Sequence, residues 1–175
     1  MSSNRSPIDA VAVRDLEQPD LARILEINQA NTPEVGSVDE DRMMFIVDES
    51  PIALVAAVDD VVAGFCLVLG AESTYDSVNY RWFTSRYHDF MYLDRVAVDA
   101  PFRGRGIGTL LYDEVDRRMS LRDRADHLAL EVNVDPPNEG SLRLHAGLGF
   151  VAVGQQDTPY GIRVSMQMRP VTRCS

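Results

Sequence analysis

The sequence predicts a single α/β domain spanning residues 1–175, and three observations lead to this prediction. Short apolar runs of strand length alternate with stretches of helical spacing along the chain. A length of 175 residues, of which 45% are hydrophobic and 25% charged, is enough to bury the core of one domain. No internal repeat, low-complexity tract or linker divides the chain, so we expect no second domain.

The first seventy residues predict a strand, two helices and a hairpin. Residues 8–14 alternate weakly in polarity, as a strand does, and residues 19–30 begin with proline and continue with helical spacing. Residues 37–40, Ser-Val-Asp-Glu, have the pattern of a capping box, which predicts that a second helix begins there. Residues 52–58 and 61–69 are apolar runs separated by two aspartates, and they predict two strands joined by a tight turn.

The rest of the chain predicts a long loop followed by further strands and helices. Residues 70–89 are polar and aromatic, and a loop of this length inside a compact domain is usually functional or disordered. After it we expect a strand, a helix, a strand, a helix and two strands, over residues 90–98, 106–119, 128–134, 138–148, 150–153 and 162–168. The prediction is therefore about seven strands and about four helices.

Charge and composition exclude several classes of protein. The net charge of −10 argues against a nucleic-acid partner, because phosphate binding needs a basic face. All 17 basic residues are arginine, so no lysine is present to form a Schiff base or to bind phosphate in a Walker loop. The histidines and cysteines are scattered without metal-ligand spacing, and we expect no metal.

The same features predict a cytoplasmic protein. Cys66 and Cys174 do not make a disulfide framework, which fits a reducing compartment. The N-terminus is polar and lacks the apolar centre of a signal peptide. The longest apolar run, residues 61–69, is too short for a membrane span, which needs roughly 20 residues.

Glycine and arginine gather at one predicted strand-to-helix junction, in the segment VAVDAPFRGRGIGTLL at residues 96–111. A helix N-terminus offers unpaired N–H groups, and glycine lets a ligand approach the backbone closely. Arg103 and Arg105 add guanidinium groups suited to phosphate oxygens. The segment fits neither a Walker loop nor a dinucleotide fingerprint. We interpret it as an anion site; the alternative is a glycine-rich turn beside surface arginines.

Two motifs resemble those of the GNAT superfamily of acyl-CoA-dependent N-acyltransferases. Arg103-x-x-Gly106-x-Gly108 resembles the R/Q-x-x-G-x-G/A signature, whose loop binds the coenzyme pyrophosphate in that family. Residues 138–150 are similar to the family's N-x-x-A…Y-x-x-x-G-F segment. The residues in register there are Asn138, Ser141, Gly149 and Phe150. The order of the predicted elements also resembles that fold, so the resemblance covers nearly the whole chain.

The resemblance implies a mixed, mostly antiparallel, twisted sheet in which the parallel fourth and fifth strands splay apart. It implies acetyl-CoA as the cosubstrate and no metal. The residues that it implies for coenzyme binding are Val96, Ala97, Val98, Arg103, Gly104, Arg105, Gly106, Ile107, Gly108, Thr109, Asn133, Asn138, Ser141 and His145. Asn133 has an alternative role as a strand-end cap.

The resemblance also implies the catalytic groups, with one departure. The family's usual tyrosine, a proposed acid toward the coenzyme thiolate, aligns with His145. The backbone N–H of Val98 is implied as a donor to the carbonyl oxygen. Asp94 and Glu131 are the candidate bases, with a salt bridge and a solvated strand face as their alternative roles. Strand alternation predicts that Asp94 faces away from the neighbouring Leu93 and Arg95.

The acceptor is expected to be a small-molecule or peptide amine. Arg81, Trp82 and Tyr92 are the candidate substrate residues, although the aromatic residues can instead cover the core. The predicted function is direct transfer of an acetyl group from acetyl-CoA to a primary amine. The alternative is a non-catalytic acyl-CoA-binding sensor or interaction module. We expect a monomer or a homodimer, without nucleic acid or membrane as a partner.

Overall fold

Seven strands form one mixed sheet in the computed structural model, which describes residues 10–122 and 125–171. The sheet order is β1-β2-β3-β4-β5-β7-β6. The strands are β1 (Val11–Asp15), β2 (Ile52–Val58), β3 (Val61–Gly70), β4 (Met91–Val98), β5 (His127–Asp135), β6 (Val151–Asp157) and β7 (Arg163–Pro170). The prediction of a seven-stranded, mostly antiparallel sheet is confirmed.

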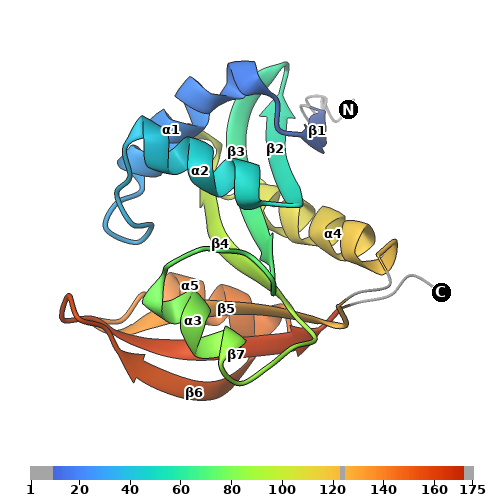
Figure 1. Cartoon of the computed structure of the whole chain (residues 1–175). Coiled ribbons are helices and arrows are strands. Elements are labelled where there is room, and N and C mark those ends of the chain that lie inside the picture. The colour runs from blue at the N-terminus through green and yellow to red at the C-terminus, as the bar shows by residue number, and fades with distance from the viewer. Residues whose placement is uncertain (1–9, 123–124, 172–175) are drawn as a thin grey trace, which may run out of the picture.

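Helices cover both faces of the sheet (Figure 1). They are α1 (Leu21–Ala30), α2 (Glu40–Glu49), α3 (Val78–Thr84), α4 (Ile107–Ser120) and α5 (Glu139–Gly147), with two short 3-10 turns, η1 (Gln18–Asp20) and η2 (Ala100–Phe102). Of these helices, none is long and apolar enough to cross a bilayer within the described part of the chain.

The two faces of the sheet carry separate cores. On one face, α1, α2 and α3 contribute buried side chains such as Ile24, Ile46 and Phe83. On the other face, α4 contributes a buried stripe that includes Leu111 and Val115, and partly buried residues of α5 pack beside it. Each helix buries one apolar face because its hydrophobic residues recur at helical spacing.

The segment predicted as a loop over residues 70–89 contains α3, so residues 10–122 and 125–171 form five α-helices rather than four. Ser77 caps this helix by accepting a hydrogen bond from the Tyr80 N–H, and Tyr80 and Phe83 bury one side of it. A helix of seven residues is too short to show two full periods, which explains why the pattern did not reveal it.

Two predicted element starts also differ from the structure. The cap of α2 is Asp39, whose side chain accepts from the Arg42 N–H at 2.8 Å, so the capping-box prediction placed the start two residues early, at Ser37. The first strand was predicted over residues 8–14. Residues 8 and 9 lie outside the described part of the chain, and β1 covers Val11–Asp15.

The pairing of β3 with β4 contains a bulge at Asp94. Leu67 is opposite Arg95 and Val68 is opposite Leu93, which leaves Asp94 without a partner on β3. Asp94 and Arg95 therefore turn to the same face, and the Arg95 Nε donates to Asp94 Oδ2 at 3.2 Å. The prediction that alternation separates these two side chains is wrong, because an inserted residue reverses the alternation after it.

A close contact between Gly154 of β6 and Trp82 of α3 gives a test of the packing. A Cβ at Gly154 would lie 2.5 Å from Trp82 Cζ2, so Gly154→Ala should destabilise the fold by about 1–3 kcal/mol through overpacking. Thermal unfolding should show a lower Tm. The emission of Trp82, the chain's single tryptophan, should also shift. Gly147→Ala is the control, because no atom lies within 4 Å of its Cβ position. Equal Tm values for the two variants would contradict this packing.

Candidate functional site

A cavity opens where β4 and β5 separate. These parallel strands pair only at Met91 with Leu128 and at Tyr92 with Ala129. Beyond these pairs lies a cavity of about 240 Å³. It is lined by Glu34, Val35, Gly36, Tyr75, Ser77, Asn79, Leu93, Asp94, Arg95, Val96, Leu130, Glu131, Val132, Asn133, Asn138, Ser141, His145 and Tyr160. The splayed arrangement follows the predicted one, and ligands commonly bind at the carboxyl ends of parallel strands.

Glu131 of β5 lies in this cavity with a partner for each carboxylate oxygen. The Tyr92 hydroxyl donates to Oε2, and Asn79 Nδ2 donates to Oε1 at 3.2 Å. Burial raises the pKa of Glu131 to about 7, with the two donors opposing the rise and the charge of Asp94 adding to it. A carboxylate with this pKa can exchange a proton near neutral pH.

Asn79 of α3 connects Glu131 to the hairpin of β6 and β7. Its side chain is buried, and its Oδ1 accepts from Gln156 Nε2 at 2.8 Å. Because Oδ1 is bound to a donor, the amide must present Nδ2 to Glu131. Asn79 Nδ2 also lies 3.5 Å from the Tyr160 hydroxyl, in the turn between β6 and β7. Sequence reasoning missed Asn79; the cap signal at Ser77 was its one local marker.

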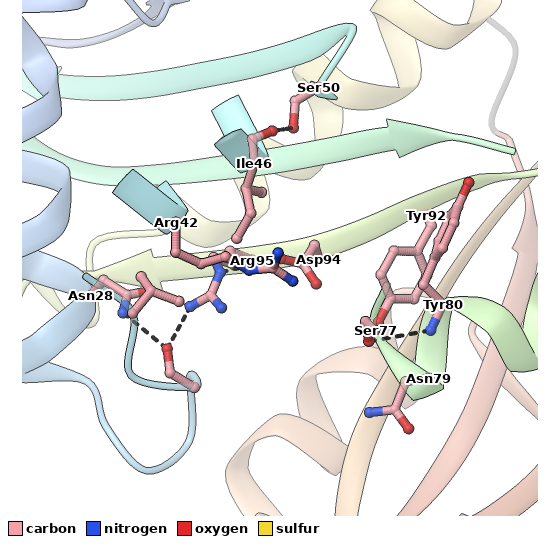
Figure 2. Close-up of polar contacts among 12 residues, drawn as sticks. Asn28, Arg42, Ile46, Ser50, Ser77, Asn79, Tyr80, Tyr92, Asp94 and Arg95 are labelled. Atoms are coloured by element: carbon pink, nitrogen blue, oxygen red, sulfur yellow. Dashed lines mark hydrogen bonds and ion pairs between the residues drawn. The ribbon is translucent and has the colours of Figure 1, made fainter. Parts of the chain in front are cut away.

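Asp94 is enclosed by other groups. Its side chain is 6% exposed and forms the ion pair with Arg95. Burial raises the pKa of Asp94, while Arg95 and the Tyr75 hydroxyl oppose the rise. Arg95 also donates to Asn28 Oδ1 at 2.8 Å and to the Gly36 carbonyl at 2.5 Å. Figure 2 shows Arg95 lying between Asn28 and Asp94, so this pair joins β4 to α1 and to the loop before α2.

His145 of α5 is buried, with both ring nitrogens hydrogen-bonded. Its Nδ1 lies 2.7 Å from the Ser141 carbonyl oxygen, which can only accept, so Nδ1 carries the proton. Nε2 therefore accepts from the Tyr112 hydroxyl, at 2.5 Å. Burial lowers the pKa of His145, which favours the neutral ring. Asn138 caps α5 by accepting from the Ser141 N–H at 3.1 Å, as the sequence predicted.

The glycine-rich loop leads from β4 to the N-terminus of α4. Gly104 and Gly106 have φ values of 78° and 77°, which glycine adopts without strain. Gly106 is the N-cap and supplies no side chain, so the first N–H groups of α4 keep the donor capacity that suits an anion. Arg103 Nη2 donates to Asn31 Oδ1 at 2.7 Å, and the Arg105 guanidinium lies 5.4 Å from the Phe102 ring centre.

The predicted coenzyme residues divide into two groups. Val96, Asn133, Asn138, Ser141 and His145 line the cavity. The others lie on β4, in the loop and in the first turn of α4. Of these, Ala97 and Ile107 are buried in the two cores, so only their backbone groups are available to a ligand, whereas Thr109 is exposed.

The predicted substrate residues do not lie together. Tyr92 reaches the site through its hydrogen bond to Glu131. Trp82 packs against Gly154, and the Arg86 guanidinium lies over the Trp82 ring, 4.1 Å from the ring centre. Arg81 is exposed on α3. Neither Trp82 nor Arg81 is among the residues that line the cavity. Within residues 10–122 and 125–171, no cluster of three metal-ligating side chains occurs.

The candidate site thus combines three features: a sheet that opens between two parallel strands, a glycine-rich loop at a helix N-terminus and a buried carboxylate with a raised pKa. Residues 19–150 match the family model of the acetyltransferase (GNAT) family. The chain belongs to this family, which confirms the resemblance found in the sequence.

Solved structures of N-acetyltransferases share the fold. The chain is 20% identical to Ard1 from Thermoplasma volcanium, with a TM-score of 0.76 over 94% of this chain and 99% of that one. The ribosomal-protein-S18-alanine N-acetyltransferase from Escherichia coli is 18% identical, with a TM-score of 0.72 over 95% and 97%. Arabidopsis thaliana NAA60 in complex with acetyl-CoA is 17% identical, with a TM-score of 0.72 over 93% and 99%. No curated protein matches the chain in sequence.

The amide of Asn79 should hold the pKa of Glu131 near neutrality. Asn79→Asp replaces a donor to Glu131 with a second negative charge, so the pKa of Glu131 should rise above about 7. Carbon NMR titration of the Glu131 carboxyl measures this change. The other two side chains that affect the pKa of Glu131, Tyr92 and Asp94 of β4, stay in place. Gln155→Glu, at an exposed position of β6, adds the same charge and should leave the titration nearly unchanged. A pKa equal to that of wild type in Asn79→Asp would contradict this account.

Proposed function

We propose that the chain transfers the acetyl group of acetyl-CoA directly to a primary amine, with Glu131 as the general base. The observation that carries this proposal is the position of Glu131 in the gap between β4 and β5, with a pKa of about 7. Asp94 is the weaker candidate, because Arg95 and Tyr75 already engage its carboxylate.

The proposed reaction has three steps. Glu131 accepts a proton from the attacking amine, directly or through one water molecule. The amine nitrogen attacks the acetyl carbonyl carbon, and the negative charge develops on the carbonyl oxygen. The carbon–sulfur bond then breaks, and its electron pair leaves on the coenzyme sulfur.

A backbone donor is available for the carbonyl oxygen. The Asp99 N–H donates to the Ala63 carbonyl of β3 at 2.8 Å. Successive N–H groups of a strand point to opposite edges, so the Val98 N–H faces the gap. This geometry supports the proposal that Val98 stabilises the oxyanion.

The proposed coenzyme site combines the loop and the open edge of β4. The pyrophosphate would bind the N–H groups at the start of α4, with Arg103 and Arg105 beside it. The pantetheine arm would hydrogen-bond the edge of residues 96–98. Acetyl-CoA supplies the activated acetyl group, and the chain supplies its placement beside Glu131.

The acceptor and the cell compartment are also matters of proposal. The structural relatives include the NatC complex bound to Gag peptide and CoA, and Arabidopsis thaliana Naa50 in complex with the bisubstrate analogue CoA-Ac-MVNAL. Peptide N-termini are therefore the first amines to assay, beside small amines. Measuring CoA release with this panel of amines distinguishes an enzyme from a non-catalytic acyl-CoA-binding module. The non-catalytic alternative is supported by His145, which stands where the family usually has its tyrosine. We further propose a cytoplasmic location, because the composition fits a reducing compartment.

Removal of the base should slow the reaction most above about pH 7, where Glu131 is ionised in the wild type. Glu131→Gln should lower kcat by about 10²–10⁴-fold, the usual contribution of a positioned base. The wild-type rate should rise with pH through about 7 and then level off, because only the ionised carboxylate accepts a proton. This rise should be absent in the variant. Glu139→Gln, an exposed change at the start of α5, is the control. A pH profile in Glu131→Gln that matches wild type would exclude Glu131 as the base.

The loop can be tested through a glycine that the fold itself does not require. No atom lies within 4 Å of a Cβ built on Gly108, so Gly108→Val should fold normally. The added side chain would project beside the N–H groups of α4 and should weaken acetyl-CoA binding at least about tenfold, since charge-assisted bonds of this kind contribute roughly 1.5–3 kcal/mol. Calorimetry measures the affinity, with Gly147→Val as the control. An unchanged Kd in the folded variant would remove the loop from the coenzyme site.

A further inference from the structure

We infer that the Ser141 hydroxyl, oriented by His145, donates the hydrogen bond that stabilises the departing coenzyme sulfur. The inference rests on the proposed function, since it needs the acetyl thioester in the gap between β4 and β5. It assigns Ser141 as the catalytic residue and His145 as a positioning residue. The resemblance in the sequence instead implied His145 as the acid.

The hydrogen bonds of His145 determine the orientation of the Ser141 hydroxyl proton. His145 Nδ1 lies 2.7 Å from the Ser141 carbonyl oxygen and 3.1 Å from Ser141 Oγ. The carbonyl oxygen can only accept, so the proton is on Nδ1 and is shared between the two oxygens. Ser141 Oγ therefore accepts from His145, and its own hydrogen is left for a different acceptor.

His145 has no proton of its own to offer to the cavity. Its Nε2 carries a lone pair that accepts from the Tyr112 hydroxyl at 2.5 Å. The side chains of Tyr112 and Phe150 enclose the ring in edge-to-face contacts, at 5.6 and 5.4 Å between ring centres. Burial also disfavours the charged imidazolium, which would have been the alternative proton source.

Ser141 is suitably placed to make the contact instead. It lines the cavity beside Asn138 and is half-buried, whereas His145 is 4% exposed. Ser141 precedes His145 by four residues, so the two lie on the same face of α5, one turn apart. It also lies in the first turn of α5, where the partial positive charge of a helix N-terminus favours an anion. Among the described residues, Ser141 Oγ forms its hydrogen bond with His145.

The proposed step needs no proton transfer from Ser141. When the carbon–sulfur bond breaks, its electron pair goes to sulfur, and the proton lost by the amine is on Glu131. A thiol has a pKa of about 8.5, far below that of an alcohol, so the sulfur leaves as a thiolate and Ser141 keeps its proton. The hydroxyl contributes a charge-assisted hydrogen bond, which is stronger to a thiolate than to the neutral thioester.

The test compares the binding of CoA with that of desulfo-CoA, which lacks the sulfur. Above the pKa of the CoA thiol, which titration of the thiolate absorbance gives, free CoA is largely the thiolate. Wild type should bind CoA more tightly than desulfo-CoA. Ser141→Ala should lose about tenfold to a hundredfold of this preference, while its affinity for desulfo-CoA stays that of wild type. Thiolate absorbance of bound CoA should show a higher thiol pKa in the variant.

Further variants separate the roles. Ser141→Thr keeps a hydroxyl and should restore most of the preference, whereas Ser85→Ala, an exposed change, should leave it intact. His145→Phe removes the orienting N–H and should reduce the preference less than Ser141→Ala does. A full preference for CoA in Ser141→Ala overturns the inference, and its loss in His145→Phe alone would identify His145 as the donor. If wild type binds neither CoA nor desulfo-CoA, the coenzyme assignment itself is overturned. If wild type and Ser141→Ala bind CoA with the same preference over desulfo-CoA, only the role of Ser141 is overturned.

Discussion

The separation of β4 from β5 after two residue pairs is the constraint on which the rest of the site depends. Two parallel strands that diverge leave backbone N–H and C=O groups without partners, which is costly unless another group binds them. The bulge at Asp94 lies just beyond the last pair and increases the local twist of β4. Arg95 then ties the diverging strand to α1 and to the loop before α2. The gap is held open by these contacts, so a ligand can use the free strand edge.

The two carboxylates in this gap differ because their partners differ. Asp94 faces a guanidinium and is held in an ion pair, whereas Glu131 receives hydrogen bonds from the neutral groups of Tyr92 and Asn79. Neutral donors compensate burial only partly, so the pKa of Glu131 stays near 7. Two acidic residues on neighbouring strands can thus serve separate purposes, one in structure and one in proton transfer.

The strands were the most predictable part of the fold. The predicted runs 52–58 and 61–69 agree with β2 and β3 to within one residue, because buried strands are continuous apolar runs bounded by turn residues. The bulge at Asp94 depends on the pairing of β4 with β3, and α3 is too short for its period to show in the sequence. At the start of α2, both Ser37 and Asp39 are residue types that cap helices, so the sequence alone does not distinguish them. For the same reason the sequence offered Glu131 and Asp94 as equal candidates. Their difference lies in Asn79, which reaches Glu131 from α3, and in Arg95, which the bulge of β4 brings to the same face as Asp94.

The absence of lysine matters chemically if the donor is an acetyl thioester, because a lysine amine can react with such a donor. The ion pairs among the described residues are made by arginine, apart from that of His127 with Asp89. A guanidinium remains protonated at any physiological pH and offers no nucleophilic nitrogen, whereas a lysine amine can be acetylated with loss of its charge. The arginine ion pairs of this fold would therefore be inert to an acetyl thioester. In a mass spectrum of a reaction mixture, any acetylated lysine belongs to another protein.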